Sequence, residues 1–209
     1  MLDTIILDLG GVLIDVDYQR TAKAFNALGF ERFEEVYSKA QQDHLFDGFE
    51  VGALSPEEFR ARIRTLSKSP IPDADIDACW NAMLGSIAAE RIEMVERLKE
   101  RYRVLLLSNT NAIHVPAFTE IARRENAIAD FKRLFHGAYY SCEIGLRKPH
   151  PEAFDHVLAL HGASATTTLF IDDSIQHVRG ARSAGLQAEH LELEQEDLPG
   201  MVHRLGLLQ

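Results

Sequence analysis

Side chains that could do chemistry stand directly after short apolar runs in this sequence. Asp8 follows "IIL" and precedes two glycines, Ser108 and Asn109 follow "VLLL", and Asp172 and Asp173 follow "LFI". A carboxylate so close to an apolar run risks a desolvation penalty, and a neighbouring glycine lets the backbone approach a ligand closely. One such position alone would indicate a turn. Three of them together indicate a site built from carboxylates and a hydroxyl group.

The elements that must position these side chains follow from periodicity. Five apolar runs have the length of strands and are too short for isolated helices: 4–7, 104–107, 138–140, 168–171 and 187–191. Helical patterns lie between most of them, at 89–100, 151–160 and 175–184. Strands that alternate with helices predict an α/β fold, a doubly wound parallel sheet covered on both faces.

In a parallel sheet the carboxyl ends of the strands share one edge, and ligands bind in the crevice there. The acids of two strand ends and the Ser108 hydroxyl group are therefore expected to converge. Crowded carboxylates repel one another unless a cation lies between them, and an all-oxygen site suits Mg²⁺ better than zinc. The sequence thus predicts a magnesium site.

Residues 17–84 interrupt the alternation of strands and helices. They contain no convincing strand but several amphipathic helical patterns, one at 20–28 and one opened by "SPEE", where Ser55 and Glu58 can form a capping box. The stretch "SPIPDADID", 69–77, is expected to be a loop because its prolines oppose a helix. The chain is predicted to have a core domain of residues 1–16 and 85–209 and a helical cap domain of residues 17–84.

A basic residue completes the set. "GLRKPHPEAF" places Lys148 before Pro149, which favours an extended lysine backbone, and a helix is expected to begin near Pro151. A fixed lysine that faces carboxylates and a metal is the pattern expected for binding a phosphoryl group.

Four stretches, "LDLGGV", "LLLSNTN", "GLRKPHPEAF" and "LFIDDSIQHVRGARSAG", resemble in order the four motifs of the haloacid dehalogenase superfamily, in its magnesium-dependent phosphatase branch. The resemblance runs from residue 4 to about residue 185 and includes a helical cap after the first motif. "LSNTN" and "GLRKP" most resemble the subgroup that includes alpha-D-glucose-1-phosphate phosphatase. The resemblance implies a Rossmann-like fold and the hydrolysis of a small phosphate monoester, with a sugar phosphate as one candidate.

The resemblance also implies roles in phosphoryl transfer. Asp8 would attack phosphorus and form an aspartyl phosphate, and Lys148 would neutralise charge between the phosphate and Asp8. Ser108 and the backbone N–H of Asn109 would bind the phosphoryl oxygens, and Gly11 would let the backbone come close to the phosphate. Phosphoryl transfer needs this combination of in-line positioning and charge neutralisation.

The metal ligands are implied in the same way. Asp8, Asp173 and the backbone carbonyl group of Gly10 would bind Mg²⁺ directly, and Asp172 would orient the water molecules around the metal. An acid that ends a strand can also simply cap the next helix, which is the competing interpretation of Asp172.

Gly10 departs from the family pattern, which usually has a second aspartate at this position as general acid and base. A proton donor contributes about 10²–10⁴-fold to the rate. One hypothesis is that the substrates have good leaving groups, such as sugar 1-phosphates or acyl phosphates, which need the acid least. The other is that another side chain replaces it. The candidates are Asp15, Asp17, His44 and Glu50.

Other side chains have competing interpretations. Thr110 and Asn111 could contact phosphate or cap a helix, and Arg147 could steer an anionic substrate or be solvated. None of the nine histidines has paired ligand spacing, and His177 is interpreted as a helix-surface residue. Three aromatic residues of the cap could line the substrate pocket or form core: Phe46, Phe49 and Trp80.

Composition restricts the partners. The 209 residues include 22 Lys and Arg against 32 Asp and Glu, a net charge of −10, so a cationic surface for nucleic acid or anionic lipid is not expected. A small phosphorylated metabolite is the expected partner, and the oligomeric state is left open. With only Cys79 and Cys142, no disulfide is expected, and neither a signal peptide nor a membrane span is indicated. The chain is therefore interpreted as mature from Met1 and cytoplasmic.

Three alternative functions share most of these features. A haloacid dehalogenase would have the fold and the nucleophile but no need of the pair Asp172 and Asp173. A phosphosugar mutase would keep the phosphate on an organic product. A phosphometabolite sensor without turnover would explain the glycine at position 10.

Overall fold

The computed structural model describes residues 1–30, 33, 45–67 and 70–208. Five strands form one sheet: β1 (Thr4–Leu7), β2 (Arg103–Ser108), β3 (Gly137–Tyr140), β4 (Thr168–Asp172) and β5 (Gln187–His190). Their order is β3-β2-β1-β4-β5, and every neighbouring pair is parallel. The predicted α/β fold with a parallel sheet is confirmed. Because β1 is the middle strand, the residue that follows it lies between the ends of β2 and β4.

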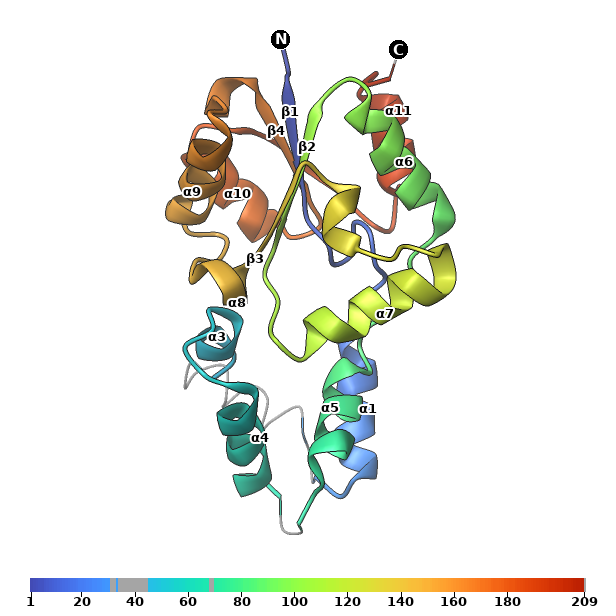
Figure 1. Cartoon of the computed structure of the whole chain (residues 1–209), viewed down its shortest axis with the longest axis vertical. Coiled ribbons are helices and arrows are strands. Elements are labelled where there is room, and N and C mark those ends of the chain that lie inside the picture. The colour runs from blue at the N-terminus through green and yellow to red at the C-terminus, as the bar shows by residue number, and fades with distance from the viewer. Residues whose placement is uncertain (31–32, 34–44, 68–69, 209) are drawn as a thin grey trace.

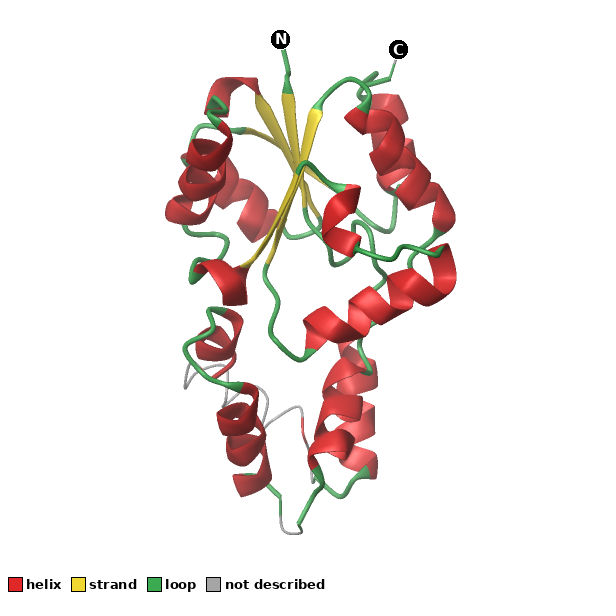
Figure 2. Ribbon diagram, viewed as in Figure 1, coloured by secondary structure: helices red, strands yellow, loops and turns green. Residues whose placement is uncertain are grey.

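Helices cover both faces of the sheet (Figures 1 and 2). One face carries α6 (Ala89–Lys99), α7 (His114–Asn126) and α11 (Leu198–Arg204), and the other carries α9 (Pro151–His161) and α10 (Ile175–Ser183). Shorter elements connect them: α8 (Ser141–Ile144) and the 3₁₀ helices η1 (Phe131–Leu134) and η2 (Ala165–Thr167). Successive side chains of β1 alternate between two apolar clusters, with Ile5 and Leu7 in one and Ile6 in the other. This alternation explains why the run is apolar throughout.

A separate group of helices, here called the helical lobe, lies at the end of the sheet where the strands terminate (Figure 1). Its described residues form α1 (Tyr18–Ala27), α3 (Leu45–Glu50), α4 (Pro56–Thr65) and α5 (Asp73–Asn81). The lobe has its own aromatic core, in which Phe49 and Phe59 stack with their ring centroids 4.2 Å apart. The predicted capping box is present: Ser55 accepts from the N–H of Glu58, whose carboxylate accepts from the N–H of Ser55.

The lobe is joined to the sheet by two chain segments that pair with each other. The N–H of Asp17 donates to the carbonyl of Met83 (2.9 Å), and the N–H of Gly85 donates to the carbonyl of Asp15 (2.8 Å). Val16 and Leu84 form an isolated antiparallel bridge between these bonds. These contacts hold the two connecting segments side by side.

The prediction of a loop over 69–77 is wrong from Asp73 onward, where α5 begins. Pro72 is the N-cap residue of this helix, so both prolines precede it and neither lies in its interior. Asp73 and Asp75 occupy its first turn, where negative charge is favourable near the helix N-terminus.

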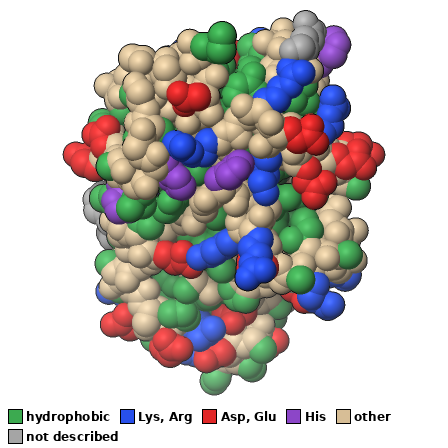
Figure 3. All heavy atoms as spheres, turned by 45° about the horizontal axis from the view of Figure 1, so that its top comes forward, with side chains coloured by type: hydrophobic (Ala, Val, Ile, Leu, Met, Phe, Trp, Pro, Cys, Tyr) green, Lys and Arg blue, Asp and Glu red, His purple; other side chains and the backbone are tan. Residues whose placement is uncertain are grey.

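The surface carries charges of both signs. On the face in Figure 3, Lys and Arg side chains lie among Asp and Glu side chains. Within the described ranges, the structure has no helix of the length and apolar character needed to cross a bilayer.

Candidate active site

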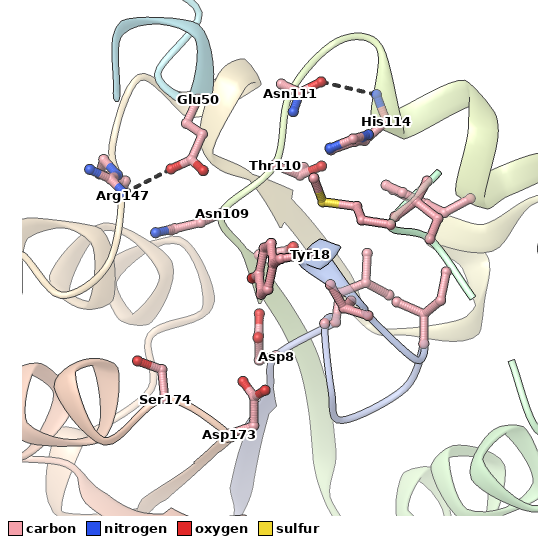
Figure 4. Close-up of a pocket in the computed structure, with 18 of the residues that line it drawn as sticks. Asp8, Tyr18, Glu50, Asn109, Thr110, Asn111, His114, Arg147, Asp173 and Ser174 are labelled. Atoms are coloured by element: carbon pink, nitrogen blue, oxygen red, sulfur yellow. Dashed lines mark hydrogen bonds and ion pairs between the residues drawn. The ribbon is translucent and has the colours of Figure 1, made fainter. Parts of the chain in front are cut away.

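A cavity of about 580 Å³ lies between the strand ends and the helical lobe (Figure 4). The sheet side contributes Asp8, Ser108 and Asp173, and the lobe contributes Glu50 and Trp80. Asp173 lies beside Asp8 in Figure 4, and Glu50 lies across the cavity from both. Three strand ends and one lobe therefore share a single cavity.

Lys148 forms ion pairs with acids at the ends of two strands, β1 and β4. Its Nζ lies 2.6 Å from Oδ1 of Asp8 and 2.7 Å from Oδ2 of Asp172. Lys148 and Asp172 are fully buried, and Asp8 is 7% exposed. Burial opposes the lysine charge, but the two carboxylates outweigh it and raise the pKa of Lys148. The lysine therefore stays protonated and holds one oxygen of Asp8.

Asn109 fixes the backbone of this lysine. Its Nδ2 donates to the carbonyl of Lys148 (2.9 Å), and its Oδ1 accepts from the N–H of Lys148 (3.0 Å). The side chain thus pairs with the peptide groups as a neighbouring strand would. This role was missed from the sequence, because residues 109 and 148 are far apart in the chain.

The acidic pair after β4 divides between two environments. Asp172 accepts from the N–H of Ser174 (2.7 Å) as well as from Lys148, while Asp173 lines the cavity. Burial alone would raise the pKa of Asp172, but Lys148 and His177 bring it below the usual value. The pKa of Asp173 is raised by burial and by the charge of Asp172. Asp172 is therefore a fixed anion and Asp173 an anion in need of a counter-charge.

His177 corrects one prediction. It was interpreted as a helix-surface residue, but its Nδ1 lies 3.0 Å from Oδ2 of Asp172 and its ring lines the cavity. The first turn of α10 brings it there, because the helix begins just after the acidic pair. A histidine in the first turn after a strand-end carboxylate was the available signal.

The donor set fits a hard divalent cation. Asp8, Asp172 and Asp173 each offer an oxygen, and these atoms all lie within 4.8 Å of one another. Burial and the neighbouring acids raise the pKa of Asp8, so ionising this group is costly without a cation. In the described part of the chain, the carbonyl oxygen of Gly10 accepts no hydrogen bond although the residue lines the cavity. Carboxylate and carbonyl oxygens are the ligands that Mg²⁺ and Ca²⁺ prefer.

Gly11 is required by the same crowding. Its φ is +69°, and a Cβ added there would lie 2.2 Å from Oδ2 of Asp173. Only glycine lets the chain pass this close to the carboxylate.

The end of β2 offers hydrogen-bonding groups to the cavity. Ser108 lines it, and among the described residues no protein group bonds the Ser108 hydroxyl. The backbone of Thr110 is bonded to Ser141, since its N–H donates to Oγ of Ser141 (2.9 Å) and its carbonyl accepts from that hydroxyl (3.0 Å), while the residue also lines the cavity. Oδ1 of Asn111 accepts from the N–H groups of Ile113 and His114 at the start of α7, where Ile113 is the N-cap residue.

The four candidates for the missing proton donor differ in their position relative to the cavity. Asp15 forms an ion pair with Arg91 (2.8 Å), Asp17 caps α1, and neither lines the cavity. His44 lies outside the described residues. Glu50 lines the cavity from the lobe, and it is the candidate that the geometry favours.

Glu50 is held by Arg147, whose Nη2 lies 2.8 Å from Oε2 of Glu50 and whose Nη1 pairs with Asp47. Burial raises the pKa of Glu50 despite the opposing charge of Arg147. Arg147 is thus an ion-pair partner of the lobe and not a solvated residue.

Aromatic side chains form the wall opposite the carboxylates. Trp80 stacks between Phe46 (5.2 Å between ring centroids) and the imidazole of His114 (5.3 Å). Phe46 and Trp80 line the cavity, whereas Phe49 belongs to the core of the lobe. Sequence reasoning did not single out His114 or Tyr18, which also lines the cavity, because their positions depend on how the lobe packs on the sheet.

Comparison with known proteins identifies the family of this chain. A model of the haloacid dehalogenase-like hydrolase family matches residues 2–185. The chain belongs to this family. The match covers the three strand-end acids and the lysine, so the resemblance read from the four motifs is confirmed at the level of the family.

Individual relatives agree with this assignment. The chain is 27% identical over 192 residues to D-ribitol-5-phosphate phosphatase from Bacteroides thetaiotaomicron, covering 90% of each. It is 28% identical over 193 residues to the sesquiterpene phosphatase astK from Aspergillus oryzae, covering 89% of this chain and 88% of the relative. The structure of the family enzyme bt-2542 from B. thetaiotaomicron in complex with magnesium and inorganic phosphate has a TM-score of 0.87 and 33% identity, covering 96% and 99% of the two chains.

Proposed function

We propose that this protein is a magnesium-dependent phosphatase that hydrolyses small phosphate monoesters, with sugar and polyol phosphates as the leading candidates. The observation that carries the proposal is the buried Lys148 between Asp8 and Asp172 at the edge of the sheet, with Asp173 beside them. The names of two relatives as phosphatases, and the magnesium and phosphate bound in a similar solved structure, support it. The closer similarity to glucose-1-phosphate phosphatases stays a prediction.

The proposed reaction has two steps. Oδ2 of Asp8, the oxygen not held by Lys148, attacks phosphorus, and the bond between phosphorus and the oxygen of the leaving alcohol breaks. Water then attacks the aspartyl phosphate, which releases inorganic phosphate and restores Asp8. A carboxylate nucleophile divides one difficult displacement into two easier ones. The hydroxyl group of Ser108, the N–H of Asn109 and Lys148 bind the transferring oxygens.

Asp8, Asp173 and the carbonyl of Gly10 would hold the metal, and Asp172 would support them from its fixed position. When bound, magnesium neutralises charge on the phosphoryl group and brings it close to Asp8. Without it, three carboxylates and a phosphate would repel one another across a few ångströms.

The helical lobe is the proposed cap domain, residues 17–84, on a core of residues 1–16 and 85–209. It supplies Glu50, Phe46 and Trp80 to the cavity and so contacts the leaving group. Its function is to exclude water and to select the substrate. A cytoplasmic location is part of the proposal, consistent with two unpaired thiols.

Phosphate release from a panel of sugar phosphates, polyol phosphates and an activated aryl phosphate tests the proposal. We expect release that requires magnesium and stops when the metal is removed with a chelator. Phosphate retained on an organic product would instead indicate a mutase. Halide release from haloacids without magnesium would indicate a dehalogenase, and tight binding without any turnover would indicate a sensor.

Replacing Gly11 tests the metal site. In Gly11→Ala the new methyl group collides with Oδ2 of Asp173, and we expect magnesium affinity to fall by about 10- to 100-fold. Titration calorimetry with Mg²⁺ measures it. Gly145→Ala is the matched control, since Gly145 has the same φ of +69° but nothing lies within 4 Å of an added Cβ. An equal loss in both variants would mean that backbone strain, not the displaced carboxylate, is responsible.

Glu50→Gln tests the proton donor. A protonated Glu50 can give its proton to the leaving oxygen, and the protonated fraction falls as the pH rises through its raised pKa. Wild-type kcat for poor leaving groups should therefore fall on the basic side, and in Glu50→Gln this limb should disappear. The variant should lose about 10²-fold with alkyl phosphates and little with aryl phosphates.

The matched control for Glu50→Gln is Asp47→Asn, which removes the other carboxylate from Arg147 but not a cavity residue. The charged and titratable groups that face Glu50 are Arg147, Asp47 and His177. Adding Gly10→Asp should restore activity to Glu50→Gln, since a Cβ at position 10 meets only Val16 at 3.4 Å. A basic limb that persists unchanged in Glu50→Gln would exclude Glu50 as the donor.

A further inference from the structure

His114, the first residue of α7, lies in the wall of the cavity opposite the proposed metal ligands. Its Nδ1 lies 2.7 Å from Oδ1 of Asn81, and its ring lies parallel to Trp80 at an interplanar angle of 3°. Both partners belong to α5 of the lobe, so this imidazole spans the boundary between lobe and sheet. Figure 4 shows it directed toward the cavity below Asn111.

The protonation state of His114 follows from its surroundings. Burial lowers its pKa to about 3, so the ring is neutral at physiological pH. Because Oδ1 of Asn81 can only accept, the proton lies on Nδ1 and the lone pair on Nε2. Among the described residues nothing bonds Nε2, and it is not one of the side-chain atoms that are both buried and unpaired. Nε2 therefore opens on the cavity as a hydrogen-bond acceptor.

Asn111 places donors next to this acceptor. Its Oδ1 is used by the N–H groups of Ile113 (3.1 Å) and His114 (3.0 Å), which fixes the orientation of the amide. Its Nδ2 then has no acceptor within the described chain, and the residue lines the cavity. A hydroxyl group both donates and accepts, and it is the neutral group that satisfies such a pair.

Charge in the cavity excludes a second anionic group. Of the described residues that line it, Arg147 is the only Lys or Arg, and its guanidinium group is paired with Glu50 and Asp47. His114 is neutral, and Asp8 and Asp173 add negative charge. A carboxylate or second phosphate on the leaving group would meet acids without an unpaired lysine or arginine to offset them.

We propose that the leaving group of the substrate is an uncharged, hydroxyl-bearing alcohol, and that Nε2 of His114 and Nδ2 of Asn111 bind its hydroxyl groups. This inference rests on the proposed phosphatase function and makes its substrate class specific. Asn81 acts as a positioning residue, since it holds the tautomer of His114 that leaves Nε2 free to accept.

An apolar leaving group is the main competitor, because Phe46, Trp80 and Met83 also line the cavity. Such a group would cover Nε2 and Nδ2 without bonding them. Unpaired polar groups at a desolvated site strongly disfavour an analogue that lacks the matching hydroxyl. The aromatic wall instead suits the C–H faces of a polyol.

Three five-carbon phosphates of similar size test the inference: a pentitol 5-phosphate, n-pentyl phosphate and a 5-phosphopentonate. We expect kcat/KM for the pentitol to exceed that for n-pentyl phosphate by about 100-fold and that for the pentonate by about 10-fold or more. Binding of the same three compounds to Asp8→Asn, measured by calorimetry, should follow the same order. This second readout does not depend on turnover.

The variant His114→Phe keeps an aromatic ring against Trp80 and removes both ring nitrogens. It should lose about 10- to 100-fold in kcat/KM with the pentitol and retain its rate with n-pentyl phosphate, so the preference collapses. An equal loss on all three compounds would mean that His114 has a structural role only. A wild-type preference for the pentyl or pentonate compound would overturn the inference, whereas no phosphate release from any compound would overturn the proposed function.

Discussion

Asp8→Asn should abolish phosphate release, with kcat lower than that of the wild type by about 10⁴-fold or more. The amide is a poor nucleophile, and it can form neither an aspartyl phosphate nor an anionic metal ligand. The protein should still fold, because Asn is nearly the same size as Asp and the N–H of residue 8 still donates to the carbonyl of Ile171 (3.0 Å). Phosphate release under steady-state conditions measures the loss, and circular dichroism checks the fold.

The same substitution should change how stability depends on pH. The pKa of Asp8 is raised above its unfolded value of 3.8, so the native state binds this proton more tightly than the unfolded chain. The contribution of Asp8 to wild-type stability without metal therefore falls as the pH rises from about 4 to neutrality. Asp8→Asn lacks this term, and its free energy of unfolding in chelator should match or exceed that of the wild type near neutral pH.

Urea unfolding of both proteins at acidic and neutral pH measures this difference. Residual release by Asp8→Asn at a tenth of the wild-type rate would mean that another group attacks phosphorus. A variant that is less stable than the wild type at every pH would mean that the carboxylate is a structural anion and not a strained nucleophile.

The sheet was predictable because its strands are buried on both faces. Such strands appear as continuous apolar runs, and the polar residue that ends each run marks the carboxyl edge. The convergence of Asp8, Ser108 and Asp173 could be predicted from parallel pairing alone. In the structure β1 lies between β2 and β4, so the residues that end these three strands are neighbours. The error at α5 came from reading Pro72 as a helix breaker where it is an N-cap.

The leaving-group side of the site could not be predicted in the same way. His114 reaches the cavity because α7 packs against α5, and Glu50 reaches it because α3 pairs with Arg147. These contacts depend on how the lobe is placed on the sheet, and no local pattern encodes that placement. Chemistry at the strand ends is therefore more visible in a sequence than specificity at a domain boundary.

Lys148→Met should impair both catalysis and folding. The lysine is the buried cation between Asp8 and Asp172, and an apolar side chain would leave two buried carboxylates without it. Activity should fall by about 10²–10³-fold or more, since a preorganised charge at the transferring phosphate is lost. The free energy of unfolding should fall by about 3–5 kcal/mol at neutral pH, because the partners of a broken buried pair stay buried.

Lys132→Met is the matched control, because Lys132 also pairs with a carboxylate, Glu143 at 2.7 Å, but both side chains are nearly half exposed. It should lose no more than about 1 kcal/mol of stability and keep full activity.

The pH dependence of stability distinguishes Lys148→Met further from Lys132→Met. Lys148 helps to hold the pKa of Asp172 below 3.8, which stabilises the native state above that pH and is lost as the pH falls through the native pKa. Without the lysine the pKa of Asp172 rises, so the deficit of Lys148→Met should be largest at neutral pH and shrink in acid. A deficit that is constant with pH would mean that Lys148 contributes packing rather than charge.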